Sequence, residues 1–457
     1  MTSLESEWTI DSLEVEGAVP SWLSGSLLRT GPARFEVGGC SLRHWFDGQA
    51  MLHRFSFDGQ QVSYANRFLH GKAYAETEKG RLGYAEFATD PCRSLFRRVQ
   101  TMYSPGSAIS DNCNVNVARL GEEFIAMTET PMPLAFDPVT LETVGVAYDP
   151  PGILTTAHPH HDPGRGELVN YAAKLGARSK YRFFGQRSAN EQRLIAELNT
   201  SRPAYVHSFG MSERHLVLAE FPFVVNPLAL ALSGRPYIEN YRWQPERGTK
   251  LHVFDRKTGD LRGSYDAEPG FCFHHVNSFE ENSELICDLL RYEDAEIIEA
   301  LYMERLHEGS EPLPAPELRR YRIDLDSGRL SEERIAEPLF ELPRINYARN
   351  GKPYRFAYGL TPAADGGWTD TVLKLDLETS HAKTWHEHGA YPGEPVFVAP
   401  PGASREDDGV LLSVVLDVEA GSSYLLVLDA QDLTERARAR VPHHIPFGFH
   451  GQYTSHA

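Results

Sequence analysis

Four histidines that are far apart in the chain stand in distinctive local sequences. His158 lies in TTAHPHHDP, His207 in AYVHSFG, His274 in FCFHHVNSF and His450 in PFGFHGQY. Imidazole is the commonest metal-ligating side chain in proteins, and we expect these four to form one mononuclear metal site. Ligands separated by so much chain can meet only at the axis of a closed fold. The histidines therefore constrain both the fold and the chemistry.

Three glutamates stand in equally distinctive phrases: Glu129 in AMTETP, Glu341 in FELPRINY and Glu394 in YPGEPVFV. A glutamate is ordinarily exposed, but the phrases around Glu341 and Glu394 are apolar or rich in proline, where an unpaired buried carboxylate would be costly. Metal-bound histidines usually donate their second ring N–H to a carboxylate or carbonyl. We expect the three glutamates to orient the histidines without touching the metal. The sequence leaves open which glutamate pairs with which histidine.

Other histidines compete for the ligand positions. The chain has 19 histidines, and an isolated histidine in a β-rich protein is more often a surface or satisfied core residue than a ligand. His160, His161 and His275 are the main competitors, because HPHH and HH offer more than one imidazole. Neutral imidazole also suits iron, zinc, copper and nickel alike. On the residues alone, both the ligand set and the metal stay open.

Short runs with strand character, mostly separated by Gly, Asp or Pro turn signals, recur along the chain. Several have the form strand, D-x-x-T or D-x-x-D, strand, which predicts hairpins. Repeated hairpins indicate an all-β sandwich, barrel or propeller, and no strict repeat decides among these. Helices are expected over 294–306 (DAEIIEALYMERL) and 190–198. Because no linker or composition shift interrupts the chain, one domain over 1–457 is the simpler interpretation.

Composition excludes several classes of function. A net charge of −18 argues against nucleic-acid binding, which needs a basic surface. Five cysteines without a C-x-x-C pair indicate neither a disulfide framework nor a zinc ribbon and fit a reducing cytoplasm. The N-terminal sequence lacks the features of a signal peptide, and no segment reaches the roughly 20 apolar residues of a membrane span. We expect a cytoplasmic, non-secreted protein that is soluble or peripherally attached to a membrane. Motifs for nucleophilic hydrolysis and dinucleotide binding are missing.

The histidine and glutamate phrases, together with VPSWLSGSLLRTGP (19–32), HWFDGQAMLHRF (44–55) and EDDGVLLSVV (406–415), resemble those of the carotenoid cleavage oxygenases. The resemblance runs from about Val19 to Tyr453 and implies a seven-bladed β-propeller, with a dome of loops and short helices over the metal face. It further implies that dioxygen is the co-substrate. It implies that Fe(II) is bound by the first histidine of each phrase, that is, by His158, His207, His274 and His450. It also implies that Glu129, Glu341 and Glu394 lie behind these ligands.

Four segments, 84–98, 110–131, 340–359 and 425–439, most resemble the β-carotene 15,15′-oxygenases and the isomerohydrolase of retinal pigment epithelium. This implies oxidative cleavage of a carotenoid, at its central double bond, to retinal-type aldehydes. Cleavage of an apocarotenoid, or at an off-centre bond, is the alternative within the family. Retinyl-ester isomerohydrolysis without dioxygen and stilbene cleavage are further alternatives, although Thr128 stands where lignostilbene-cleaving relatives carry a phenol-binding Lys. A propeller that only binds a metal or a partner explains the glutamates poorly.

Candidate substrate contacts are Phe87, Val115, Thr128 and Tyr205, which would line the tunnel for the carotenoid or apocarotenoid. Core packing is the competing interpretation for Phe87 and Tyr205. Val115 replaces a Thr found near the iron in several alkene-cleaving relatives. The stretch FPFVVNPLALAL (221–232) is too short to span a bilayer, and predicts either a membrane-surface patch or a buried dome segment. Residues 92–98, with Leu95 and Phe96, would extend such a patch.

Overall fold

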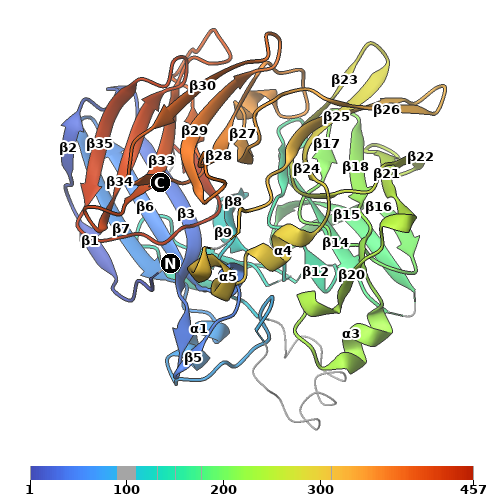
Figure 1. Ribbon diagram of the computed structural model, residues 1–457, viewed down its shortest axis with the longest axis horizontal. Coiled ribbons are helices and arrows are strands. Elements are labelled where there is room, and N and C mark those ends of the chain that lie inside the picture. Colours follow the sequence, from blue (N-terminus) through green and yellow to red (C-terminus); the bar gives the residue numbers. More distant parts are fainter. Residues whose placement is uncertain are drawn as a thin grey trace.

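Antiparallel sheets of short strands make up most of the fold. The computed structural model describes residues 2–89, 110–130, 132–149, 151–176, 178–309 and 311–455. Within these residues, seven sheets of four to six strands are arranged as blades around a centre (Figure 1), and two further pairs of strands form small ribbons. The prediction of an all-β, seven-bladed propeller is confirmed.

Both ends of the chain contribute to the two blades that close the ring. One blade has the order β1 (Trp8–Ile10), β7 (Gln61–Phe68), β6 (Gln49–Asp58), β3 (Gly25–Arg34) and β36 (Gly451–Thr454). The other has the order β2 (Glu14–Gly17), β35 (Glu435–Val441), β34 (Ser422–Asp429), β33 (Val410–Asp417) and β31 (Ala390–Pro392), with β32 (Val396–Val398) also paired to β33. In Figure 1 blue N-terminal strands therefore lie beside red C-terminal strands.

The other five blades follow one another along the chain. The first two contain β11 (Thr143–Val146), β10 (Leu134–Phe136), β9 (Glu123–Met127) and β8 (Asn116–Leu120), then β12 (Leu154–Thr155), β13 (His160–Asp162), β14 (Glu167–Lys174), β15 (Ser179–Ser188) and β16 (Glu191–Thr200). The next contains β17 (Gly210–Met211), β18 (His215–Glu220), β21 (Thr249–Asp255) and β22 (Leu261–Ala267). The last two contain β23 (Phe271–Glu281), β24 (Glu284–Tyr292), β25 (Glu317–Asp324) and β26 (Arg329–Arg334), then β27 (Glu341–Arg344), β28 (Phe356–Pro362), β29 (Thr369–Asp376) and β30 (His381–His386).

Aspartates fix the hairpin turns within the blades. At the end of β21, Asp255 Oδ1 accepts the backbone N–H groups of Lys257 at 2.8 Å and Thr258 at 2.9 Å. An aspartate that bonds the backbone two and three residues ahead closes a turn by itself. This explains why the strand, D-x-x-T, strand pattern predicts hairpins correctly. Apolar side chains from neighbouring blades then pack between the sheets, as Leu27 and Phe55 do with Leu412.

Short helices and ribbons cover one end of the propeller as a dome. The helices are α1 (Lys72–Thr77), α3 (Pro227–Ser233), α4 (Glu296–Ala300) and α5 (Met303–Glu308), with single 3-10 turns η1 (Trp45–Asp47), η3 (Ile238–Asn240) and η4 (Pro245–Arg247). A further 3-10 turn, η5 (Tyr347–Arg349), follows β27 and is not part of the dome. The ribbons pair β4 (Glu36–Val37) with β5 (Cys40–Ser41) and β19 (Phe223–Val225) with β20 (Tyr241–Trp243). In Figure 1, α4 and α5 lie across the centre of the view.

Two helix predictions need correction. The expected helix over 294–306 is two helices, α4 and α5, because Tyr302 is extended and the N–H of Met303 bonds to Arg43 O at 2.9 Å. The expected helix over 190–198 is wrong: those residues begin β16, which pairs along β15 and buries Ile195 and Ala196. Helix propensity is a weak signal, and strand pairing overrides it here.

The apolar stretch 221–232 divides between core and surface. Residues 221–225 are buried and include β19. Asn226 caps α3 by accepting the N–H of Leu228 at 3.0 Å, and Leu228 and Leu232 of that helix are 67% and 66% exposed. In the described part of the chain, every helix is too short or too polar to cross a bilayer.

Candidate metal centre

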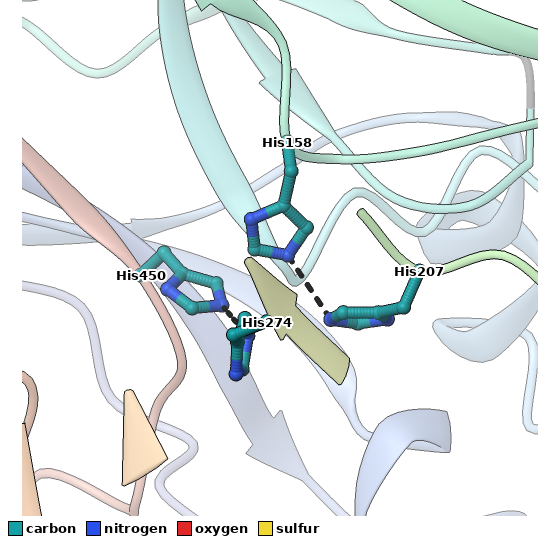
Figure 2. A group of neighbouring side chains, drawn as sticks. All are labelled: His158, His207, His274 and His450. Carbon is teal, nitrogen blue, oxygen red and sulfur yellow. Dashed lines mark hydrogen bonds between the residues drawn. The ribbon is translucent and has the colours of Figure 1, made fainter. Parts of the chain in front are cut away.

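The four histidines meet where the inner strands of four blades approach the axis. His158 precedes β13, His207 precedes β17, His274 lies in β23 and His450 directly precedes β36. One ring nitrogen from each histidine lies within 4.8 Å of those of the other three, and Figure 2 shows the rings directed toward one centre. The Nε2 atoms of His158 and His207 are 3.0 Å apart, and those of His274 and His450 are 3.2 Å apart.

Irregular inner strands present these side chains. The inner strand beside β14 is broken between β12 and β13 at His158, and pairing of β23 with β24 shifts register between Cys272 and His275. Breaks and bulges of this kind re-aim side chains beside functional sites. Proline favours the breaks because it cannot donate to a ladder, and it follows His158 at position 159 and Glu394 at position 395.

Each predicted glutamate contacts one histidine. The distances between carboxylate oxygen and Nδ1 are 2.6 Å for Glu129 and His207, 2.5 Å for Glu341 and His274, and 2.7 Å for Glu394 and His450. A carboxylate accepts the Nδ1–H, so the lone pair of Nε2 faces the centre in these three rings. Among the described residues, His158 has no carboxylate at its Nδ1.

A further layer of donors supports the carboxylates. Tyr205 Oη donates to Glu129 at 2.5 Å, and Tyr292 Oη donates to Glu341 at 2.8 Å. Glu394 instead accepts the N–H of Gly451 at 3.0 Å and has Arg344 Nε 3.2 Å away. Sequence reasoning missed Tyr292 and Arg344. The signal for Arg344 was its place in the same phrase as Glu341.

Burial and the neighbouring charges set the protonation of this cluster. Burial alone would raise the pKa of Glu394, but the charges of Arg344, His450 and Arg29 hold it at about 2. Burial lowers the pKa of His450 to about 4, although Glu394 acts against that change. Burial and the three neighbouring imidazoles hold the pKa of His158 well below its usual range. The imidazoles of His158 and His450 are therefore neutral near pH 7 and keep free lone pairs.

The donor set fits a divalent transition-metal ion. Three lone pairs of fixed orientation converge with the His158 imidazole, and close nitrogens without a proton between them repel unless a cation lies among them. Four neutral nitrogens suit first-row metals such as iron, cobalt and zinc. The competing histidines lie elsewhere: His160 bonds to Asn350 and to Phe209 O, and His275 bonds to Ser208.

An apolar cavity of about 290 Å³ lies between the dome and the histidines. Three of the four predicted tunnel residues, Phe87, Val115 and Thr128, line it, whereas Tyr205 lies behind Glu129. Its floor includes His207, His274 and His450, and its apolar wall includes Trp45, Phe46, Phe273, Ile297, Trp368 and Phe449. Leu95 and Phe96, with the rest of 92–98, lie outside the described residues.

Comparisons with known proteins find relatives over almost the whole chain. The sequence profile of the retinal pigment epithelial membrane protein family matches residues 1–455. Carotenoid isomerooxygenase of Galleria mellonella is 33% identical over 96% of this chain and 92% of its own length. Beta,beta-carotene 15,15′-dioxygenase of Mus musculus is 32% identical over 96% and 88%. Cobalt-substituted apocarotenoid oxygenase of Synechocystis superposes with a TM-score of 0.86 at 26% identity, over 99% of this chain and 97% of that one.

Proposed function

Because this chain belongs to the retinal pigment epithelial membrane protein family, with its carotenoid-cleaving dioxygenases, we propose that it is an Fe(II)-dependent dioxygenase that cleaves a carotenoid double bond. The proposal rests on one observation: carboxylates hold three imidazoles with their Nε2 lone pairs converging on the floor of an apolar cavity. A hydrolase that uses a nucleophilic side chain, or a dinucleotide-dependent enzyme, would not need this arrangement.

The residues divide the work between ion and substrate. His158, His207, His274 and His450 would hold the ferrous ion, which supplies the electrons that dioxygen needs to react with an alkene. Glu129, Glu341 and Glu394 fix the tautomers of their histidines and offset the charge of the ion. Rings such as Phe46 and Phe273 would enclose the polyene and exclude water from the reacting double bond.

Central cleavage of β-carotene to two molecules of retinal is the specific reaction we favour. The support is the 32% identity to the mouse 15,15′-dioxygenase over most of both chains. The alternatives are cleavage of an apocarotenoid or of an off-centre bond, supported by the similarity to Synechocystis apocarotenoid oxygenase. Thr128 at the cavity wall offers no ammonium group for a stilbene phenol.

Product analysis with labelled dioxygen tests the reaction. Iron-loaded protein should convert β-carotene in air to carbonyl products that carry label, allowing for exchange with water, and removal of dioxygen should stop turnover. An apocarotenal and a retinyl ester serve as competing substrates. Retinol formed from the ester without dioxygen, with no carotenoid cleaved in air, would contradict dioxygenase function and assign isomerohydrolysis.

His207→Ala tests the metal assignment, with His161→Ala as the matched control because His161 is exposed and outside the cluster. Iron retention and cleavage should fall sharply in the first variant and stay unchanged in the second. Full iron occupancy in His207→Ala would remove His207 from the ligand set.

We also propose that α3 docks the protein on the membrane in which carotenoids dissolve. Leu228 and Leu232 are exposed on this helix, while Leu230 packs against the core cluster that includes Phe223 and Tyr241. Exposed apolar side chains next to the substrate compartment favour reversible attachment to lipid.

A further inference from the structure

A second cavity lies on the other side of the four-histidine cluster. It has a volume of about 510 Å³ and is lined by inner-strand segments from all seven blades. Such a lining places it along the propeller axis. Among the described residues, the lining sets of the axial and apolar cavities share two members, His274 and His450. His158 lines the axial cavity alone, and His207 lines the apolar cavity alone.

The two cavities differ in chemistry. Polar side chains line much of the axial cavity, among them Asn116, His160, Ser208, His275, Asn350 and Gln452, and its charged lining residues are Arg119, Arg344 and Glu394. The apolar cavity offers a hydrated dication mainly aromatic and aliphatic walls. Moving a charged group from water into apolar surroundings is very costly unless polar partners replace its hydration. Apart from Glu86, Glu129 and Glu341, the apolar cavity has few groups that could replace the hydration of a metal ion, whereas polar groups recur along the axial cavity.

An imidazole with a free nitrogen lies on this axial path. The hydroxyl of Ser208 donates to Phe273 O at 2.6 Å, so His275 Nδ1, 2.9 Å away, donates to that hydroxyl. His275 Nε2 then carries a lone pair, and in the described part of the chain it has no hydrogen-bond partner. His275 lines the axial cavity beside His158 and His274. This nitrogen is itself buried, so His275 contributes an unpaired polar atom beside the path and not a nitrogen that is open to it.

The turn η5 reaches across the outer end of the axial cavity. It follows β27, yet it bonds to the β13 blade, three blades away around the ring. Tyr347 Oη accepts the N–H of His161 at 3.0 Å, and Asn350 Oδ1 is 3.1 Å from His160 Nδ1. On its own side, Asn277 Nδ2 donates to Arg349 O at 3.0 Å. The turn is therefore pinned at both ends over the cavity.

We propose that the axial cavity is the path by which a divalent metal ion reaches and leaves the four histidines, and that η5 is its cover. The organic substrate and the metal ion then use opposite faces of the cluster. The inference rests on the proposed function only in taking the cluster as a metal site, and cobalt(II) alone serves as the probe.

Obstruction of the outer mouth gives the first test. Ala348 and Ala399 are both exposed and line the axial cavity, so Ala348→Trp with Ala399→Trp fills the mouth without overpacking the core. We expect cobalt(II) uptake by chelator-stripped protein, followed by visible absorption in stopped flow, to slow by at least about tenfold. Release to a chelator should slow by the same factor, because a path changes rates in both directions and leaves the affinity constant.

Two control variants separate the paths. Ala420→Trp adds the same bulk at an exposed turn away from the cavity and should leave both rates unchanged. Ala315 lines the apolar cavity. Ala315→Trp should weaken binding of a polyene and leave cobalt uptake at the wild-type rate. Slower cobalt uptake in Ala315→Trp, with normal uptake in the Ala348/Ala399 double variant, would overturn the proposal.

Loosening of the cover gives the opposite test. Tyr347→Phe with Asn350→Ala removes both bonds from η5 to the β13 blade and should accelerate cobalt uptake and release together. Unchanged rates in the plugged and loosened variants alike would overturn the axial path and leave carotenoid cleavage standing. A wild-type protein that binds no cobalt would overturn the metal site and this path together, whereas normal cobalt kinetics without any cleavage would overturn the proposed reaction alone.

Discussion

At the level of single residues, the supports of the carboxylates differ around the cluster. Neutral tyrosine hydroxyls bond to Glu129 and Glu341, whereas Glu394 lies beside the charged guanidinium of Arg344. A carboxylate supported by a neutral donor keeps more of its charge for the histidine it faces. The imidazoles of His207 and His274 are therefore polarised more strongly than that of His450. Changes to the tyrosines that bond to Glu129 and Glu341 should therefore alter metal affinity most.

Tyr292→Phe tests this support. Loss of a hydrogen bond to a charged group costs about 1.5–3 kcal/mol, and part of that cost should appear as weaker metal binding, because Glu341 still contacts His274. We expect cobalt(II) affinity to fall about threefold to tenfold, and Glu341→Gln to lower it about 10- to 100-fold. Chelator competition measures both. Tyr358→Phe, which removes a hydroxyl bonded to Ala430 O far from the cluster, is the control, and equal losses in both tyrosine variants would contradict the assignment.

Glu86 in the wall of the apolar cavity predicts a pH-dependent stability. Burial raises its pKa from 4.5 to about 8, although Ser110 donates to its carboxylate at 2.7 Å. Between these two values the folded chain holds a proton that the unfolded chain has lost, so stability falls as pH rises through this window. The slope is at most about 1.4 kcal/mol per pH unit.

Glu86→Gln should remove this slope. The free energy of unfolding of the variant, taken relative to that of the wild type, should therefore increase as pH rises from about 5 to 8. Denaturant titrations across that range measure the difference. Glu122→Gln, at an exposed position, is the control and should run parallel to the wild type. A constant difference between the Glu86→Gln variant and the wild type would show that Glu86 is ionised in the fold.

At the level of elements, the sequence predicts strands better than helices. Aspartate turns and alternating apolar residues are local signals, and the hairpins they predict, such as β21 with β22, are present. The error at 190–198 has a different origin, because β16 consists of helix-forming residues whose partner β15 is what holds them extended. The number of blades came from family resemblance, since no repeat in the sequence reports it.

The site shows the same division between local and tertiary information. The four histidine phrases are local signals, and the structure brings the first histidine of each phrase together. The pairing of Glu129 with His207, and the supporting role of Tyr292, depend on contacts between different blades. Such contacts follow from blade order and strand irregularities, which a single sequence does not encode in any readable pattern.

Helix α3 yields a prediction on membrane attachment. Leu228 and Leu232 are 67% and 66% exposed, so Leu228→Asp with Leu232→Asp removes apolar surface without disturbing the core. Each buried leucine contributes about 1.5–3 kcal/mol to transfer from water, and liposome binding and activity on membrane-dissolved carotenoid should fall together. Cobalt binding should not change. The matched control is Val144→Asp with Val146→Asp, at exposed positions of β11. Undiminished liposome binding in the folded α3 variant would exclude this helix as the docking element.

At the level of the whole molecule, closure of the ring and assembly of the four-histidine cluster depend on the same short segment. β36 pairs with β3 over four residues, from Ser26 with Thr454 to Arg29 with Gly451. The N–H of His450, directly before β36, bonds to Val115 O at 3.1 Å in the next blade. The last histidine therefore reaches the centre only when the C-terminal strand has joined the N-terminal blade.

A chain ending at His450 tests this coupling. It lacks the four ladder pairs of β36 and the bond from Gly451 to Glu394. Their loss should lower the free energy of unfolding by about 2–4 kcal/mol. Cobalt affinity should fall as well, because His450 is then no longer held in place by β36. A chain ending at Thr454 keeps β36 and should match the full chain in both measurements. Gly451→Ala gives a milder version of the same change, since its added Cβ would lie 2.5 Å from Arg29 Cγ. Calorimetry and chelator competition on the two shortened chains and the Gly451→Ala variant should rank them in the same order for stability and for cobalt affinity. A destabilised chain that binds cobalt as tightly as the full chain would show that cobalt binding does not depend on ring closure.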